Sequence, residues 1–350
     1  MLAYLDHAAT TPVRPEAAEA MLPWLTGRYG NPSGAHAVAR AARQAIEEAR
    51  DELAAVLGCQ PRELVFTSGG TESDNLAIAG VSGPVACSAI EHHAVLDPVR
   101  HRGGAVFALG DAPPADAELV SVMLVNNEVG TVQSLDDVDA PIVHTDAVQA
   151  LPWLDVASAA ARADLISVSA HKVGGPQGVG ALVVREGVRV APLLRGGGQE
   201  RERRSGTQNV AGIVGFAAAV RACRAHPPDV AVMRDRLVAG LTSIEGCRTS
   251  VDLAGTVPGI LSLVFDDVES EALLVLLDRA GVCASAAASC ASGAMEASHV
   301  LRAFGVATGG ALRLSLGWTT TDAEINHALA VIPSAVAQLR EHKNEMGGAA

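Results

Sequence analysis

The stretch SAHKVGGPQGVGAL, residues 169–182, lies at the centre of the pattern that decides the fold. It overlaps two short β-rich runs, DLISVSA and GALVV, which enclose a His-Lys pair and a run rich in glycine. Short apolar runs bounded by turn residues predict buried strands. An ammonium group directly after such a strand has three interpretations: a lysine that binds phosphate, a lysine that forms a Schiff base, or a surface lysine beside a turn.

Similar β-rich runs precede this stretch and alternate with helical segments. The clearest helical segment is residues 35–58, where Ile46, Leu53 and Leu57 fall on one side and Gly58 ends the helix. Strands that alternate with helices predict an α/β fold whose mostly parallel sheet is covered on both faces. The predicted strands lie in ELVFTS, PVACSA, AVFAL, LVSVMLV, PIVHTDA, DLISVSA and GALVV.

The pattern changes after about residue 209, beyond which strands are fewer. This change predicts a second, smaller α+β domain, and Pro227-Pro228 is the expected hinge. Its elements are expected to be helices at 209–224 and 229–244, the runs CRTSV and GILSLVF, a helix at 269–280, the run ALRLSL and a final helix from residue 321.

Composition and charge exclude several classes of protein. The chain has 350 residues, of which 49% are hydrophobic and 19% charged, so it is not a disordered chain. A formal net charge of −13 argues against a general nucleic-acid binder. There is no signal peptide and no apolar run long enough to span a bilayer, so we expect a cytoplasmic protein without membrane contact. The six cysteines lack zinc-type spacing and are expected to be free thiols, with no metal site.

Several polar motifs follow predicted strands. TSGGTES, residues 67–73, precedes a helix and is typical either of a phosphate site or of a capped turn. HTDAVQ places Asp146 at a strand end, where α/β folds bind ligands, although an aspartate there can also cap a helix. A parallel sheet would gather these strand ends into one crevice. The side chains expected there are Thr71, His92, Asn127, Asp146, His171 and Lys172.

This set of residues favours pyridoxal 5′-phosphate over a nucleotide. In a P-loop the lysine follows the glycines, whereas Lys172 precedes them. A pyridoxal phosphate site needs a lysine for the Schiff base, an aspartate at the pyridine nitrogen and a helix end for the phosphate. We therefore interpret Lys172 as the Schiff-base lysine.

Taken together, the motifs resemble those of the cysteine desulfurases, the NifS- and IscS-like enzymes of the class V aminotransferase superfamily. The resemblance extends from residue 4 to about residue 325. It implies a pyridoxal phosphate-dependent transferase of fold type I. The large α/β domain, residues 13–227, would hold a mostly parallel seven-stranded sheet, and residues 1–12 and 228–350 would form the small domain with the catalytic cysteine loop. The matching motifs are YLDHAATTPV, GNPSGAH, TSGGTESDNLAI, EHHAVL, NNEVG, HTDAVQ, SAHKVGGPQGVGAL, RRSGTQNV, SCASGAMEASHVLRA and LRLSLG.

The resemblance also implies a role for each matching residue around the cofactor ring. Lys172 would form the Schiff base, and His92 would stack over the ring and take part in catalysis. Asp146 would pair with the pyridine nitrogen. Asn127 and Gln149 would contact the cofactor and the substrate near the ring oxygen.

Further roles concern the phosphate, the substrate and the sulfur. Arg313 would bind the substrate carboxylate, as a bidentate guanidinium suits it. Cys290 would be the nucleophile that accepts sulfur, whereas the nearby Cys283 is expected to be inessential. The phosphate ligands implied are Gly70, Thr71, Ser169, His171 and, from the second subunit of a homodimer, Thr207.

The implied activity is the removal of sulfur from L-cysteine, which gives L-alanine and a persulfide on Cys290. An acceptor protein for iron–sulfur cluster assembly or tRNA thiolation would collect the sulfur, and the only metal contact expected is a transient one between Cys290 and a cluster. The residues leave three alternatives open: a selenocysteine lyase or class V aminotransferase with the same cofactor site, a catalytically silent dimer that acts as an assembly platform, and a nucleotide-binding protein.

Overall fold

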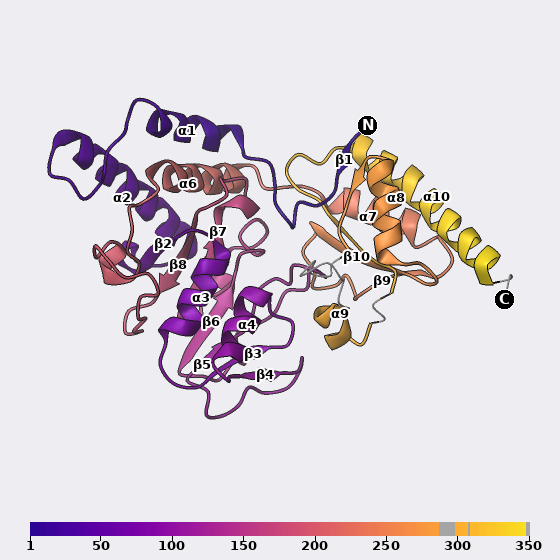
Figure 1. Ribbon diagram of the computed structural model, residues 1–350, viewed down its shortest axis with the longest axis horizontal. Helices are drawn as coiled ribbons and strands as arrows, with labels where there is room; N and C mark the ends of the chain where they lie inside the picture. The colour runs from indigo at the N-terminus through magenta and orange to yellow at the C-terminus, as the bar shows by residue number, and fades with distance from the viewer. Residues whose placement is uncertain (287–297, 307–308, 348–350) are drawn as a thin grey trace. The chain divides into compact units, whose positions relative to one another are not determined.

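The computed structural model describes residues 1–286, 298–306 and 309–347, which fall into two compact units (Figure 1). The larger unit contains Thr11–Val125 and Gln133–Pro227. The smaller unit contains Met1–Thr10, Asn126–Val132 and the chain from Pro228 onward. In the part of the chain that is described, no helix is long and apolar enough to cross a membrane.

A seven-stranded sheet forms the centre of the larger unit, with the strand order β2-β8-β7-β6-β5-β3-β4. All neighbouring strands are parallel except that β8 is antiparallel to both β2 and β7. The predicted α/β fold with a mostly parallel sheet is therefore confirmed, and each of the seven predicted runs contains one strand. The bounds are β2 Leu64–Thr67, β3 Val85–Ser88, β4 Ala105–Phe107, β5 Leu119–Ser121, β6 Ile142–Asp146, β7 Leu165–Ser169 and β8 Gly180–Val184.

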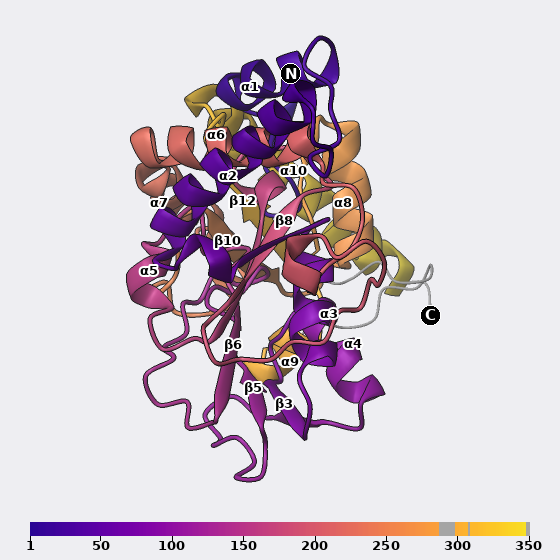
Figure 2. The ribbon, with the colours of Figure 1, turned by 90° about the vertical axis from the view of Figure 1, so that its left-hand side faces the viewer.

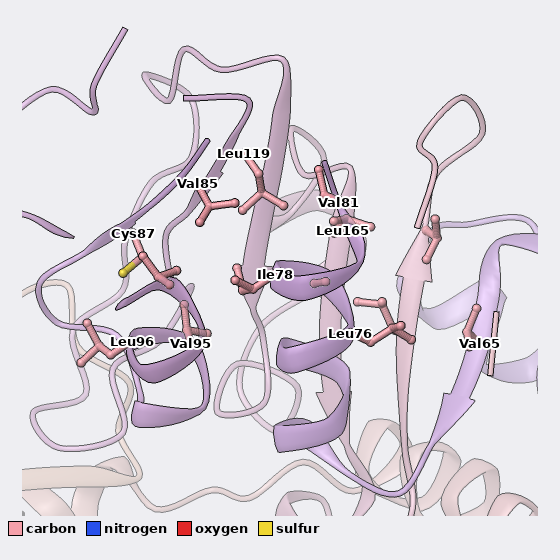
Figure 3. Close-up of a cluster of buried hydrophobic side chains, with 14 residues drawn as sticks. Val65, Leu76, Ile78, Val81, Val85, Cys87, Val95, Leu96, Leu119 and Leu165 are labelled. Atoms are coloured by element: carbon pink, nitrogen blue, oxygen red, sulfur yellow. The ribbon is translucent and has the colours of Figure 1, made fainter. Parts of the chain in front are cut away.

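Helices α3 (Gly70–Gly80) and α4 (His93–His101) pack on the sheet through a buried apolar cluster (Figure 3). Figure 2 shows the two helices together on one side of strands β3, β5 and β6. Leu76 from α3 and Leu96 from α4 are both almost fully buried in this cluster. Burying one such side chain stabilises the fold by about 1.5–3 kcal/mol. The cluster therefore fixes the first turn of α3 at the end of β2.

A second group of helices in the larger unit consists of α1 (Pro15–Leu25) and α2 (Ala37–Leu57), which both pack against α6 (Val210–Ala225). Helix α2 is the predicted amphipathic helix, and it ends at Gly58 in the left-handed conformation with φ +63°. Short helical turns complete the unit: η1 (Pro61–Glu63), α5 (Val156–Ala159), η2 (Ala170–Lys172) and η3 (Glu200–Glu202).

The smaller unit combines two small sheets with four helices among the described residues. An antiparallel sheet has the order β12-β10-β9, and a parallel pair joins β1 to β11. The strands are β1 Ala3–Tyr4, β9 Cys247–Thr249, β10 Ile260–Phe265, β11 Val282–Cys283 and β12 Ala311–Ser315. The helices are α7 Ala231–Leu241, α8 Ser270–Arg279, α9 His299–Ala303 and α10 Asp322–Gly347.

The segment Asn126–Val132 belongs to the smaller unit, although both flanking segments belong to the larger one. The N–H of Val132 donates to the carbonyl of Gly255 at 2.9 Å. The N–H of Val257 donates back to the carbonyl of Gly130, also at 2.9 Å. These bonds hold the polar NNEVG motif on the smaller unit, a placement that periodicity in the sequence does not reveal.

Candidate active site

Three polar groups lie at the carboxyl ends of two neighbouring strands of the larger unit. Asp146 is the last residue of β6, and His171 and Lys172 lie in η2 directly after β7. The ammonium group of Lys172 lowers the pKa of His92, His171 and Asp146. This shared electrostatic influence is consistent with a grouping of these residues near Lys172, as strand ends at one edge of the sheet predict.

The carboxylate of Asp146 is buried and held in place by the backbone. Its Oδ1 accepts a hydrogen bond from the N–H of Val148 at 2.8 Å. Burial raises the pKa of Asp146 to about 6, although the Val148 hydrogen bond and the charge of Lys172 oppose the rise. A buried carboxylate of this kind is best stabilised by a cationic partner, and a protonated pyridine nitrogen provides one.

A polar network in the same face of the sheet lies next to Asp146. His144 is two residues earlier on β6, so both side chains point to the same face. Its Nδ1 lies 2.8 Å from Ser121 Oγ on β5, and its Nε2 lies 3.0 Å from Ser167 Oγ on β7. Burial lowers the pKa of His144 to about 3, so the imidazole is neutral at physiological pH.

Two buried carboxyl groups extend this network. Asp74 Oδ1 on α3 lies 3.6 Å from His144 Nε2, and Ser121 Oγ donates to Glu91 Oε1 at 3.2 Å. Burial, together with the charge of Asp146, raises the pKa of both Asp74 and Glu91 well above the usual range. Both groups are therefore harder to ionise than ordinary carboxyl groups, and Asp146 is the member of the cluster that ionises most readily. The sequence signal that could have revealed this network is the presence of polar residues inside the otherwise apolar strand runs.

The first turn of α3 supplies a site for a phosphate. Helix α3 begins at Gly70, and a Cβ atom there would lie 2.8 Å from Val148 Cγ2 and 3.7 Å from Ser169 Cβ. The absence of a side chain thus lets Ser169, at the end of β7, lie beside the helix start. Thr71 follows in the same turn and is exposed. The first N–H groups of a helix have no acceptor within the helix and favour an anion.

His92 and Gln149 flank these groups. His92 caps α4, where its Nδ1 accepts a hydrogen bond from the N–H of Ala94 at 3.1 Å. Although part of His92 is exposed to solvent, the surrounding protein desolvates the ring. This burial, with the charge of Lys172, lowers the pKa of His92 to about 4. The same two causes lower the pKa of His171 to about 4, so both rings are neutral. Gln149 is buried in the turn after β6.

Asn127 and Arg313 lie together on the smaller unit. Arg313, on β12, donates from Nη1 to the carbonyl oxygen of Asn127 at 2.9 Å. Its Nη2 donates to Asp6 Oδ1 at 2.8 Å, in an ion pair that the sequence reasoning missed. The Nε of Arg313 is buried and has no hydrogen-bond acceptor among the described residues. A carboxylate ligand would satisfy it. The sequence signal for the ion pair with Arg313 was the position of Asp6 in the motif YLDHAATTPV.

The cysteine predicted to carry sulfur, Cys290, lies outside the described residues. The five described cysteines are free thiols, as expected. Burial raises the pKa of each: to about 11 for Cys59 and Cys247, and in the same direction for Cys87, Cys223 and Cys283. A raised pKa leaves little thiolate at neutral pH. These five thiols are therefore poor nucleophiles.

The donor set fits pyridoxal 5′-phosphate. It offers an amine at Lys172, a fixed carboxylate at Asp146 and a helix start with a glycine at Gly70. Thr207 is exposed and lies in the loop between η3 and α6. Within the described ranges, no group of three or more His, Cys, Asp or Glu residues is arranged to hold a metal ion.

Comparison with known proteins identifies the family. The sequence model of the aminotransferase class-V family matches residues 3–106 and 111–327. An IscS-like cysteine desulfurase of Mycobacterium tuberculosis is 41% identical, over 99% of this chain and 100% of that protein. A solved NifS-like protein is 34% identical with a TM-score of 0.87, covering 96% of this chain and 100% of that one. The structure of SspA in complex with cysteine is 32% identical with a TM-score of 0.77, covering 91% and 99%.

The chain therefore belongs to the aminotransferase class-V family and, within it, to the cysteine desulfurases. The resemblance stated from the motifs is confirmed, and with it the fold type, the enzymatic nature of the protein and its dependence on pyridoxal 5′-phosphate. The roles of individual residues stay predictions.

Proposed function

We propose that this enzyme removes the sulfur atom of L-cysteine and transfers it to Cys290. The reaction converts L-cysteine and the Cys290 thiol into L-alanine and a Cys290 persulfide. The carbon–sulfur bond of the substrate breaks and a sulfur–sulfur bond forms, so the substrate β-carbon is reduced by two electrons and the two sulfur atoms, that of Cys290 and that of the substrate, are oxidised by one electron each. The similarity to SspA, solved in complex with cysteine, supports this substrate.

The observation that carries the proposal is the grouping of Asp146, His171 and Lys172 at the ends of β6 and β7. Pyridoxal 5′-phosphate, when bound, supplies a ring that accepts the electron pair released at the substrate α-carbon. Asp146 would hold a proton on the pyridine nitrogen. Lys172 would hold the cofactor and then move the α-proton, with neutral His92 as the other candidate base.

Binding of the substrate and of the phosphate involves the remaining residues. Arg313, with Asn127 beside it, would bind the substrate carboxylate. Gln149 would contact the ring oxygen. The phosphate would be bound by Gly70, Thr71, Ser169 and His171, and by Thr207 of a second copy in a homodimer.

The two units would act as separate domains. The larger would bind the cofactor, and the smaller would carry Arg313 and the Cys290 loop. The persulfide would pass to an acceptor protein for iron–sulfur cluster assembly or tRNA thiolation. We place the enzyme in the cytoplasm, where a reducing environment keeps thiols free, as the described cysteines are.

The alternative reaction is that of a selenocysteine lyase or an aminotransferase of the same family. The described thiols all have raised pKa values, so none competes with Cys290 as a thiolate. A persulfide mechanism therefore depends on Cys290 alone.

The test compares wild type with Cys290→Ala, by visible spectrum and by release of alanine and sulfide from L-cysteine with dithiothreitol. Cys283→Ala is the matched control. We expect the same cofactor band in all three proteins and loss of desulfuration only in Cys290→Ala. Undiminished desulfuration in that variant would remove Cys290 from the mechanism, and amino-group transfer to keto acids would favour the aminotransferase.

A further inference from the structure

The loop that carries Thr207 is fixed to the larger unit by a buried ion pair. Glu200 is only 5% exposed and Arg50, on α2, only 1%. The carboxylate of Glu200 accepts from Arg50 Nη1 and Nη2, each at 3.0 Å, and from the N–H of Phe66 at 3.0 Å. A charged pair this deeply buried is costly unless its hydrogen bonds are satisfied, and here they are.

The guanidinium of Arg50 is also held by contacts with β2. Its Nη1 also donates to the carbonyl of Leu64 at 2.7 Å, and its guanidinium lies 4.6 Å from the centroid of the Phe66 ring. Leu64 and Phe66 belong to β2 in the central sheet. Arg50 therefore connects Glu200 to strand β2 of the sheet and to helix α2.

The backbone at Glu200 adopts a conformation that needs such support. Glu200, Arg201 and Glu202 have φ values of 49°, 56° and 65°. Three consecutive residues other than glycine in the left-handed region are rare, because their Cβ atoms crowd the backbone. Such a conformation persists where surrounding contacts determine it and is concentrated at functional sites.

Two further hydrogen bonds hold the loop, one before Thr207 and one after it. Arg204 Nε donates to Glu72 Oε1 at 2.8 Å, and Glu72 lies in the first turn of α3, next to Thr71. Gln208 Nε2 donates back to Glu200 Oε1 at 2.5 Å. The stretch between these attachments contains Gly206 and Thr207, and both are exposed. The loop is thus fixed on both sides of a side chain that faces outward.

We propose that Arg50 and Glu200 are positioning residues that shape this loop so that Thr207 reaches the cofactor phosphate of a second copy of this chain. The inference rests on the proposed homodimer. Leu193 and Leu194, directly before the loop, are 44% and 46% exposed, and apolar surface beside a fixed loop fits coverage by another chain. Because the loop serves the other copy, a defect at Glu200 should appear in the partner's cofactor site and not in its own.

Mixed dimers, assembled from differently tagged copies, test whether Glu200 acts on the cofactor site of the other copy or on its own. The readout is the visible absorbance of cofactor bound at Lys172 during titration with pyridoxal phosphate, which only copies with Lys172 give. The Glu200→Gln homodimer should bind the cofactor at least about tenfold more weakly, as expected for one lost hydrogen bond to a charged group. Glu186→Gln, at an exposed pair with Arg62, is the matched control and should bind normally.

Two mixed dimers (hybrids) then show in which copy the weaker cofactor binding appears. When Glu200→Gln is paired with a Lys172→Ala copy, the intact Lys172 receives a normal loop, and wild-type affinity should return. When a double variant, Glu200→Gln with Lys172→Ala, is paired with wild type, the intact Lys172 receives the altered loop, and binding should stay weak. The opposite pattern would show that Glu200 acts within its own copy and would overturn the inference.

Thr207→Ala in the same two hybrids separates this inference from the proposed function. If Thr207→Ala acts across the dimer and Glu200→Gln does not, only the role of Glu200 fails. If Thr207→Ala itself acts within its own copy, the proposed dimeric phosphate site fails too. Arg50→Met, which keeps apolar volume on α2, should repeat the Glu200→Gln pattern, and a normal Arg50→Met homodimer would also contradict the inference.

Discussion

Replacement of Asp146 by asparagine should make the cofactor-free protein more stable and the cofactor-bound protein less stable. Asp146 is buried, and among the described residues the groups that stabilise its ionised form are the N–H of Val148 and the ammonium of Lys172. Asparagine has nearly the same shape, and its Oδ1 can keep the hydrogen bond from Val148. The substitution therefore removes a buried charge without opening a cavity.

The magnitude follows from the pKa of Asp146, which rises from 3.8 to about 6 in the folded chain. At about 1.4 kcal/mol per pH unit, that rise corresponds to about 3 kcal/mol. An acid with a higher pKa in the folded state binds its proton more tightly there. Its ionisation therefore has almost no effect on stability below about pH 4, destabilises the fold progressively as the pH rises from about 4 to about 6, and has its full effect above that.

The assay is urea unfolding of cofactor-free wild type and Asp146→Asn at about pH 4 and about pH 8, with an expected difference near zero at the first and up to about 3 kcal/mol at the second. Asp164→Asn is the matched control: Asp164 also accepts a backbone N–H, from Val143 at 2.9 Å, but its side chain is 29% exposed. At saturating pyridoxal phosphate the order should reverse, because only wild type gains the full binding free energy. A cofactor-free variant less stable than wild type at about pH 8 would refute the reasoning.

Two further substitutions test contacts outside this cluster. Asp6→Ala removes the ion pair that orients Arg313. In steady-state kinetics, the KM for L-cysteine should therefore rise about tenfold, with a smaller change in kcat. An unchanged KM would mean that Arg313 is oriented without Asp6. Gly180→Ala would place a Cβ atom 2.7 Å from the Cα of Gly69, so urea unfolding should show a loss of about 1–3 kcal/mol, whereas Gly27→Ala, with no atom within 4 Å of the new Cβ, should be neutral.

The central sheet could be predicted from the sequence because its signals are local. Each strand is a short apolar run ended by turn residues, and the catalytic candidates follow these runs directly. Parallel strands then bring their ends together whatever the exact register. Asp146 and Lys172 could be grouped for this reason alone, without knowledge of the helices that cover the sheet.

Other parts of the structure depend on contacts between distant segments. Strand β1 has two residues, and it pairs with β11 at the other end of the chain. The segment Asn126–Val132 joins the smaller unit through hydrogen bonds to residues near Gly255. Neither has a periodic pattern, because two to seven residues are too few to show one. The ion pairs of Arg313 with Asp6 and of Arg50 with Glu200 likewise join side chains that only tertiary packing brings together.

The polar network next to Asp146 determines which carboxyl group of the cluster ionises most readily. Burial raises the pKa of Asp74 and Glu91 well above the usual range, so both ionise less readily than Asp146, and it lowers the pKa of His144 to about 3, so that imidazole is uncharged. If Asp74 were ionised, its charge would raise the pKa of Asp146 further. The network therefore favours negative charge at one carboxylate, and a cationic ring nitrogen, if it paired with Asp146 as predicted, would offset the free energy that burial of this charge costs.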